Sequence, residues 1–404
     1  MERKKNFFAS LTREKLHLVC TTYYMYFVLG VALLLIGSIL PTVQQEYGLS
    51  YGVSGMLLSM ISVGCLVAGA GAGALPLLIG MKRSVMLLCD AMFVGLLLLA
   101  LIGQPAVLLG AAFLIGISKG AMSNYNNQIV TTLSNADAMP LNLLHAAFAM
   151  GAGLAPFVAL ICGASWRTAI YITLALGIGM LLMQVRMRGL PQAQTGARQE
   201  GSTFGFFREP MFLLCLALMC CYQAAEVSFM GWMVTFFQAG GTLTDSFSQV
   251  LTSLLWLSLV VGRMICAKLS QRFSTRAMIL AMTCGIVAFF SLMLLGKSAV
   301  MMTVSTMGLG LCMSGMYGTT VANAGSVFKR YPQCMGMFVA IPGIAAVIAP
   351  AVVGAIADSA GIHTGMATLY LPVLFMLGLA AVNVCFSNKL SGAIAQQEVP
   401  VENN

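Results

Sequence analysis

The chain has very little charge for its length. Only 8% of its 404 residues are Asp, Glu, Lys or Arg, whereas soluble proteins carry about a quarter. Hydrophobic residues make up 59% of the chain, and no water-soluble fold could enclose that much apolar surface. The composition therefore excludes a soluble globular protein. It indicates an all-α polytopic membrane protein, because helices satisfy their own backbone hydrogen bonds in lipid.

The chain also lacks the patterns on which common metal, redox and phosphate-transfer sites depend. Its 12 cysteines include no Cys-x-x-Cys pair, so we expect small packing residues, with neither a metal nor a cofactor. The G-x-x-x-x-G-K-[ST] phosphate loop of ATP-driven pumps is missing. GISKG (116–120) fits the G-x-S-x-G hydrolase pattern but lies inside an apolar run, not at a strand-to-helix turn. We therefore expect no enzymatic activity.

Apolar runs long enough to span a bilayer, roughly 20 residues, occur twelve times. The predicted spans are 17–40, 53–79, 84–102, 106–131, 141–162, 166–185, 211–237, 246–269, 277–295, 300–327, 334–357 and 366–386. The longest polar stretch, 186–210, separates the first six from the last six. We expect two six-helix bundles, 1–185 and 211–404, joined by this linker.

Basic residues gather on one side of these spans. Of the 21 Lys and Arg residues, only Arg167 and Lys297 fall opposite the termini, and only Lys119 and Arg263 fall within spans. The positive-inside rule then places both termini and the linker in the cytoplasm, in a plasma membrane of the bacterial inner-membrane type. The net charge of +9 is thus explained by topology and contact with anionic lipids, without nucleic acid.

An internal repeat relates the two halves. A shift of 194 residues, which places Gly116 on Gly310, also places Pro156 on Pro350 and the first span on the seventh. A six-plus-six duplication is the architecture of many secondary transporters, in which the substrate binds between the halves.

The segment GALPLLIGMKR (73–83), between the second and third spans, resembles the signature loop of the major facilitator superfamily, G-x-L-a-D-r-x-G-r-K. The matching positions are Gly73, Leu75, Gly80 and Lys82. Leu77 stands where the pattern has Asp, so latching through that carboxylate is not expected. The second copy, AKLSQRFSTR, keeps Arg272 and Arg276. The resemblance implies the major facilitator fold, with Gly80, Lys82, Arg272 and Arg276 in gating or structural roles.

Two further segments are similar to the fucose–proton symporter-like branch of that superfamily. LNLLHAAFAMGAGLAPFV (141–158) resembles its fifth helix, and YQAAEVSFMGWMVTFF (222–237) resembles its seventh. The resemblance implies a secondary transporter, expected to act as a monomer, that moves a sugar or related small polar solute by alternating access with protons. The first span lacks the carboxylate of fucose-type symporters. An efflux carrier for amphipathic compounds and a non-transporting receptor or scaffold stay open as alternatives.

Ionisable residues within spans are costly, at about 2.5–3.5 kcal/mol each at the bilayer centre, so most should face the interior. Lys119 and Glu226 lie near the midpoints of spans in opposite halves. We expect Glu226 to carry the coupled proton, and Lys119 to bind the substrate or to pair with Glu226. Asp90, His145 and Arg263 lie nearer the cytoplasmic ends and are expected to have gating or structural roles.

Polar and aromatic side chains near these two residues extend the candidate site. Some share the helix face of Lys119 or Glu226, and others project from the eighth and tenth spans. The predicted substrate-binding set is Lys119, Ser123, Asn126, Asn127, Tyr222, Gln223, Trp256, Tyr317 and Asn323. Hydrogen bonding between helices is the alternative for the polar members, and packing for the aromatic ones. The Gly-Ala run 68–74 is expected to permit close helix packing.

Overall fold

The computed structural model describes residue 8 and residues 11–134, 138–163, 165–190, 205–240, 243–331 and 334–397. These residues are helical almost throughout, and no β-strand occurs among them. Eleven described segments are long and apolar enough to cross a membrane. The last of these, Cys334–Cys385, has 52 residues and turns back at Gly361, whose φ of 81° suits glycine. It therefore makes two passes, and the twelve predicted spans are confirmed.

The first bundle makes six passes. Its helices are α1 (Arg13–Tyr47), α2 (Tyr51–Ile79), α3 (Met81–Cys89), α4 (Ala91–Leu101), α5 (Pro105–Leu133), α6 (Ala138–Cys162) and α7 (Trp166–Val185). The third predicted span is divided into α3 and α4, with a break at Asp90.

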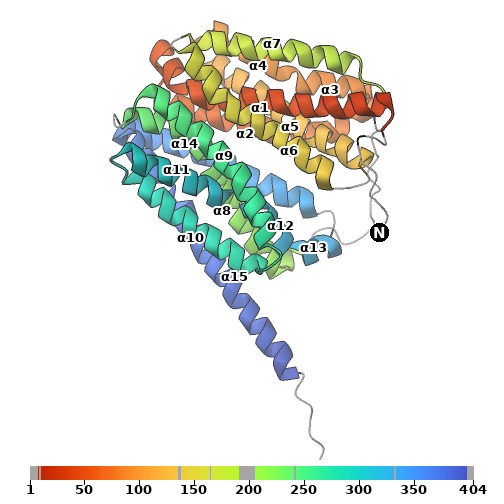
Figure 1. The fold of residues 1–404 in the computed structure, drawn as a ribbon, viewed down its shortest axis with the longest axis vertical. Helices are drawn as coiled ribbons and strands as arrows, with labels where there is room; N and C mark the ends of the chain where they lie inside the picture. Colours follow the sequence, from red (N-terminus) through yellow and green to blue (C-terminus); the bar gives the residue numbers. More distant parts are fainter. Residues whose placement is uncertain are drawn as a thin grey trace, which may run out of the picture.

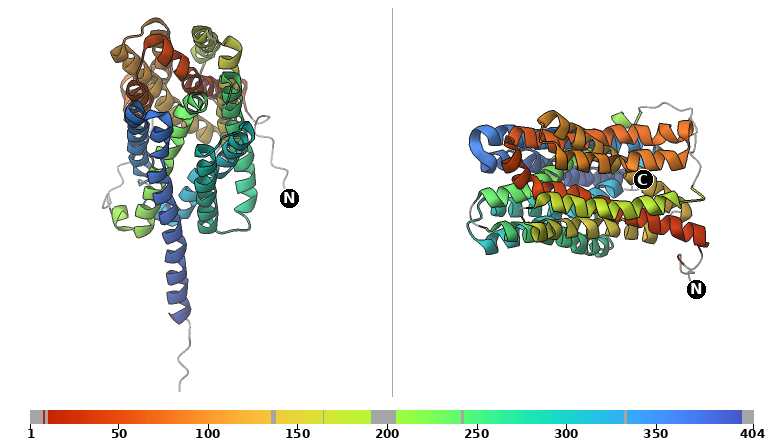
Figure 2. Two further views of the ribbon diagram at one scale, coloured as in Figure 1. Left: turned by 90° about the vertical axis from the view of Figure 1, so that its left-hand side faces the viewer. Right: turned by 90° about the horizontal axis from the view of Figure 1, so that it is seen from above.

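The second bundle makes the other six passes. Its helices are α8 (Pro210–Ala239), α9 (Asp245–Leu269), α10 (Thr275–Leu294), α11 (Ala299–Met313), α12 (Met316–Asn323), α13 (Gly325–Arg330), α14 (Cys334–Ala367) and α15 (Tyr370–Gln397), and a short 3-10 turn, Gly205–Arg208, precedes them. The tenth predicted span is divided into α11, α12 and α13. Figure 2 shows α15 continuing beyond the rest of the bundle.

Hydroxyl side chains fix the start of several helices. Ser50 accepts a hydrogen bond from the backbone N–H of Val53, and Ser274 accepts one from that of Ala277. Each bond satisfies one of the free donors in a first helical turn. The same bond forms at Thr12, Thr244 and Ser298. Capping residues thus determine where these helices begin, whereas the thickness of the bilayer determines the length of their apolar segments.

The internal repeat is visible in how the helices pack. Gly116 of α5 lies so close to α2 that a Cβ atom there would overlap the backbone of Ile61. Gly310 of α11 lies in the same way against the backbone of Leu255 in α9. The shift that relates the two glycines also relates Ile61 to Leu255. One close helix contact is therefore present in both halves, as the pseudo-symmetry of the two bundles requires.

The two bundles meet mainly at one end. We call the end where α7 finishes and α8 begins the linker side, and the opposite end the far side. Three hydrogen bonds join the bundles in their far-side halves: Gly52 N–H to Asp358 Oδ2 at 2.8 Å, Gln249 Nε2 to Ser38 O at 2.8 Å, and Ser253 Oγ to Gly153 O at 3.0 Å. Figure 1 shows the bundles close together there and diverging towards the end that holds the N-terminus.

The Gly-Ala run in α2 makes the expected close contact through its alanines: a Cβ atom at Gly120 of α5 would lie 2.8 Å from the Cβ of Ala68, and Ala68 and Ala72 are buried. Its glycines make no such contact. A Cβ atom at Gly69, Gly71 or Gly73 would meet nothing within 4 Å, and the same holds at Gly336 of α14. All four glycines lie in the linker-side parts of their helices. Open space therefore lies beside these glycines on the linker side.

Candidate functional site

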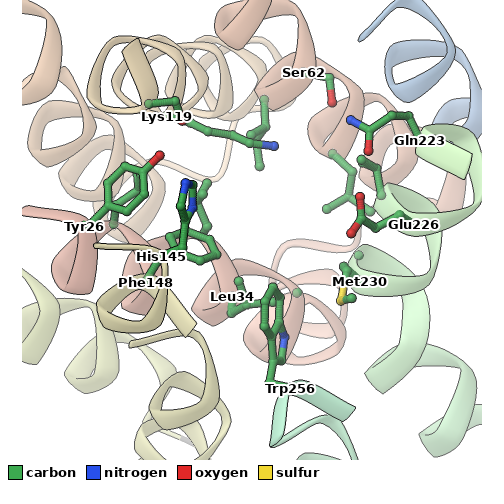
Figure 3. A pocket seen from close by; sticks show the side chains of 18 of the residues that line it. Tyr26, Leu34, Ser62, Lys119, His145, Phe148, Gln223, Glu226, Met230 and Trp256 are labelled. Carbon is green, nitrogen blue, oxygen red and sulfur yellow. The ribbon is translucent and has the colours of Figure 1, made fainter. Parts of the chain in front are cut away.

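A cavity of about 400 Å³ lies between the two bundles. Its walls come from α1, α2, α5 and α6 of the first bundle and from α8 and α9 of the second. This volume is within the range of small-molecule sites, about 300–1,000 Å³. Figure 3 shows the side chains that point into it.

Lys119 of α5 and Glu226 of α8 face the cavity from opposite sides (Figure 3). Within the described part of the chain, no ion pair shorter than 4.0 Å involves either side chain. The Tyr222 hydroxyl lies 2.7 Å from Glu226 Oε1 and 3.1 Å from the carbonyl oxygen of Met313, and its single proton can serve either acceptor. Lys119 and Glu226 therefore do not form a static pair in this conformation.

His145 of α6 and Arg263 of α9 also line the cavity. Arg263 lies near enough to interact electrostatically with both His145 and Glu226. Both residues were expected nearer the cytoplasmic helix ends, in gating or structural roles. Their position on the wall adds two basic side chains to the site.

Aromatic side chains form one wall of the cavity. The rings of Phe148 and Trp256 meet edge to face with centroids 5.9 Å apart, and Tyr26 lies 5.7 Å from both Phe148 and His145. The indole Nε1 of Trp256 has no hydrogen-bond partner among the described residues. Tyr26 and Phe148 were not predicted as site residues, although both are aromatic residues within spans, as Trp256 is.

The structure brings together part of the predicted substrate-binding set. The predicted residues that line the cavity are Lys119, Ser123, Gln223 and Trp256, with Glu226. Asn127 lies behind this surface, where it and Ser123 approach the Tyr26 hydroxyl. Tyr222 is buried behind Glu226, and Asn126 is fully buried without a hydrogen-bond partner among the described residues.

Tyr317 and Asn323 do not line this cavity, and neither does any residue of α11, the first part of the same pass. Tyr317 is 44% exposed. Asn323 accepts a hydrogen bond from Thr275 and donates one to Asn383, both at 3.0 Å. Its Nδ2 also contacts the sulfur atoms of Met211 and Cys215 in α8, so Asn323 joins α12 to α8, α10 and α15. This is the structural alternative considered for polar residues in spans.

The predicted gating or structural residues lie away from the cavity, except for His145 and Arg263. Gly80 joins α2 to α3 with a φ of 84°, and Lys82 donates a hydrogen bond to the Val185 carbonyl at the end of α7. Asp90 lies at the break between α3 and α4, beside Gln184 of α7. Arg272 lies between α9 and α10, and Arg276 lies in the first turn of α10.

The chain resembles proteins of known family along most of its length. The family model described as Major Facilitator Superfamily matches residues 22–327. A TsgA homologue from Erwinia tasmaniensis is 20% identical over 375 residues, which cover 90% of this chain and 94% of that protein.

Solved transporter structures share the fold. A point mutant of the nucleoside transporter NupG is 15% identical and superposes with a TM-score of 0.75, over 92% of this chain and 99% of that one. A D-xylose–proton symporter is 12% identical, also with a TM-score of 0.75, over 91% and 96%. At these identities the likeness shows a common architecture.

Proposed function

The chain belongs to the Major Facilitator Superfamily, and from that premise we propose that it is a proton-coupled secondary transporter of a small polar organic solute. The observation that carries the proposal is the cavity between the bundles, in which Lys119 of one half faces Glu226 of the other. Ionisable residues that line an interior cavity of a membrane protein commonly mark a substrate or ion pathway. A sugar or a related compound fits the mixed polar and aromatic walls.

The domains and their orientation follow from the same proposal. Residues 1–185 and 211–404 form the moving halves, 186–210 is a cytoplasmic linker, and both termini are cytoplasmic in the plasma membrane. The linker side is then the cytoplasmic side, and the structure is an inward-facing state. The contacts between Gly52 and Asp358 and the open space around Gly69 support this assignment. Rocking of the halves would expose the cavity to the other side.

Glu226 is the proton carrier in this proposal. It lies on the cavity wall, and its carboxylate contacts the Tyr222 hydroxyl but forms no ion pair within the described residues. Protonation of Glu226 removes the one negative charge on the described part of the cavity wall, so binding of the proton changes the charge that the solute meets. Solute and proton entering the same cavity would therefore move in one conformational cycle.

Two alternative functions, an efflux carrier and a non-transporting receptor or scaffold, can be distinguished by experiment. Apolar side chains such as Leu29, Leu33 and Met230 also line the cavity and would suit an amphipathic efflux substrate. A receptor or scaffold would bind a solute without moving it. The direction of proton-driven movement separates uptake from efflux, and the absence of any solute-dependent flux would identify a receptor or scaffold.

The test is flux in proteoliposomes that contain the purified protein. An inward proton gradient should drive accumulation of at least one solute from a panel of sugars, nucleosides and organic acids. A protonophore should abolish the accumulation, because it removes the gradient without affecting the protein. Protein-free liposomes are the control. No protein-dependent flux with any member of the panel would reject the proposal.

A further inference from the structure

The ionisable groups on the cavity wall are unbalanced in charge. Lys119 and Arg263 are basic, His145 can become so, and Glu226 is the one acidic residue among the described residues that line the cavity. Neither Lys119 nor Arg263 forms an ion pair within 4.0 Å in the described part of the chain. With Glu226 ionised the wall carries a net positive charge, and with Glu226 protonated it carries more.

Unpaired positive charge in a cavity is costly once water leaves, because the protein interior stabilises it poorly. Every transport cycle passes through a closed state, in which the cavity is sealed from both sides of the membrane. A neutral solute would leave Lys119 without a counter-charge at that stage, whereas an anionic solute would supply one. The solute can therefore provide the charge that the wall lacks.

We infer that the transported solute is a small organic monoanion, whose carboxylate is bound by Lys119 and Arg263. The inference rests on the proposed function and narrows its substrate class. Lys119 offers a point charge with three donors, and Arg263 offers a planar fork that matches a carboxylate. The two side chains come from α5 and α9, so one carboxylate joins both halves of the protein.

The aromatic wall of the cavity indicates what the rest of the solute is like. Trp256 and Phe148 present an apolar surface, and the Trp256 Nε1 donor has no partner among the described residues. An organic body with one hydrogen-bond acceptor suits this wall better than a fully hydroxylated sugar does. An aromatic or short aliphatic carboxylate fits a cavity of about 400 Å³.

A solute with one negative charge is also consistent with the coupled movement of one proton. A monoanion that enters with a proton on Glu226 adds no net charge to the cavity. The loaded and empty proteins then carry equal charge when they close, so neither pays an additional electrostatic cost in the bilayer. Transport should accordingly be electroneutral.

The positive potential of the cavity can be measured without knowing the solute. The chain has 3 tryptophans, and Trp166 and Trp232 are only 1% and 0% exposed, so soluble quenchers act mainly on Trp256. Iodide should quench the purified protein several-fold more strongly than caesium does, since a basic cavity concentrates anions. Lys119→Gln should remove most of this difference while quenching by neutral acrylamide stays the same. Equal quenching by iodide and caesium would overturn the inference, whether or not flux is found.

Binding then separates anionic from neutral solutes. The probes are pairs of similar shape: benzoate and benzamide, phenylacetate and phenylacetamide, galacturonate and galactose. At least one acid should raise the melting temperature more than its neutral partner. Lys119→Gln should weaken its binding about tenfold or more, the loss of a charge-assisted hydrogen bond. Lys297→Gln is the control, because Lys297 is exposed outside the cavity. Equal or stronger stabilisation by the neutral partners, or none by any acid, would overturn the inference.

Discussion

The carboxylate of Asp358 in α14 accepts a hydrogen bond of 2.8 Å from the backbone N–H of Gly52, in the first turn of α2. The two residues belong to opposite bundles. A carboxylate at a helix N-terminus satisfies a free donor and interacts favourably with the helix dipole. This bond therefore stabilises the closed far side, and it must break when the far side opens.

Asp358→Ala should loosen the far side. Loss of a capping carboxylate costs about 1 kcal/mol, which corresponds to a shift of about fivefold in the equilibrium between closed and open far sides. Hydrogen–deuterium exchange in the first turn of α2 should accelerate by a similar factor. Ser359→Ala is the matched control, because the Ser359 hydroxyl is exposed and bonds only to Ile356 of its own helix. Unchanged exchange in Asp358→Ala would show that the bond does not hold the far side closed.

Glu226→Gln should separate exchange from accumulation. The amide keeps the size of the carboxyl but cannot carry a proton, so the variant should exchange solute across proteoliposomes and lose accumulation driven by a pH gradient. Glu209→Gln is the control, since Glu209 pairs with Arg330 outside the cavity. Normal gradient-driven accumulation by a folded Glu226→Gln protein would exclude Glu226 as the proton carrier.

Gly116→Ala should destabilise the first bundle. The added methyl group would overlap the backbone of Ile61, and such overpacking costs about 1–3 kcal/mol. The melting temperature should fall. Gly110→Ala in the same helix is the control, because a Cβ atom there meets nothing within 4 Å, and its melting temperature should stay equal or rise. Equal melting of the two variants would contradict the close packing of α2 and α5.

Reporter fusions should fix the orientation. Fusions after Gln104 and Asp245, at the starts of α5 and α9, should behave as external. A fusion within the linker, 186–210, should behave as cytoplasmic, as the distribution of Lys and Arg requires. A cytoplasmic signal after Gln104 or Asp245 would reject the proposed orientation.

The positions of the spans could be predicted closely from the sequence, because the thickness of the bilayer fixes both their length and their polarity. The predicted span 166–185 coincides with α7, and 53–79 differs from α2 by two residues at its start. The turn at Gly361 falls in the predicted gap between the spans 334–357 and 366–386. The breaks at Asp90 and Gly315 were not predicted. They interrupt the backbone without interrupting the apolar run, so hydropathy gives no sign of them.

The candidate site was predicted less completely. The cost of burying charge was sufficient to select Lys119 and Glu226, but depth along a helix does not say which face meets the cavity. For this reason His145 and Arg263 were given other roles, and Tyr26 was not selected. Asn323 was expected in the site because it is polar within a span, but its amide bonds to neighbouring helices instead. These differences depend on helix rotation and on the placement of each helix, which only packing between helices determines.

The close helix packing is repeated in both halves, but the ionisable residues of the cavity are not. This difference affects the relative free energies of the two open states. At the shift that relates Gly116 to Gly310, the four ionisable residues of the wall fall on apolar partners: Met313, Val339, Ala32 and Gly69. Two similar bundles alone would make the inward-open and outward-open states nearly equal in free energy. The unmatched charges break this degeneracy. Together with the bond between Gly52 and Asp358, they favour one resting state of the empty protein, and hence the side from which it first receives its solute.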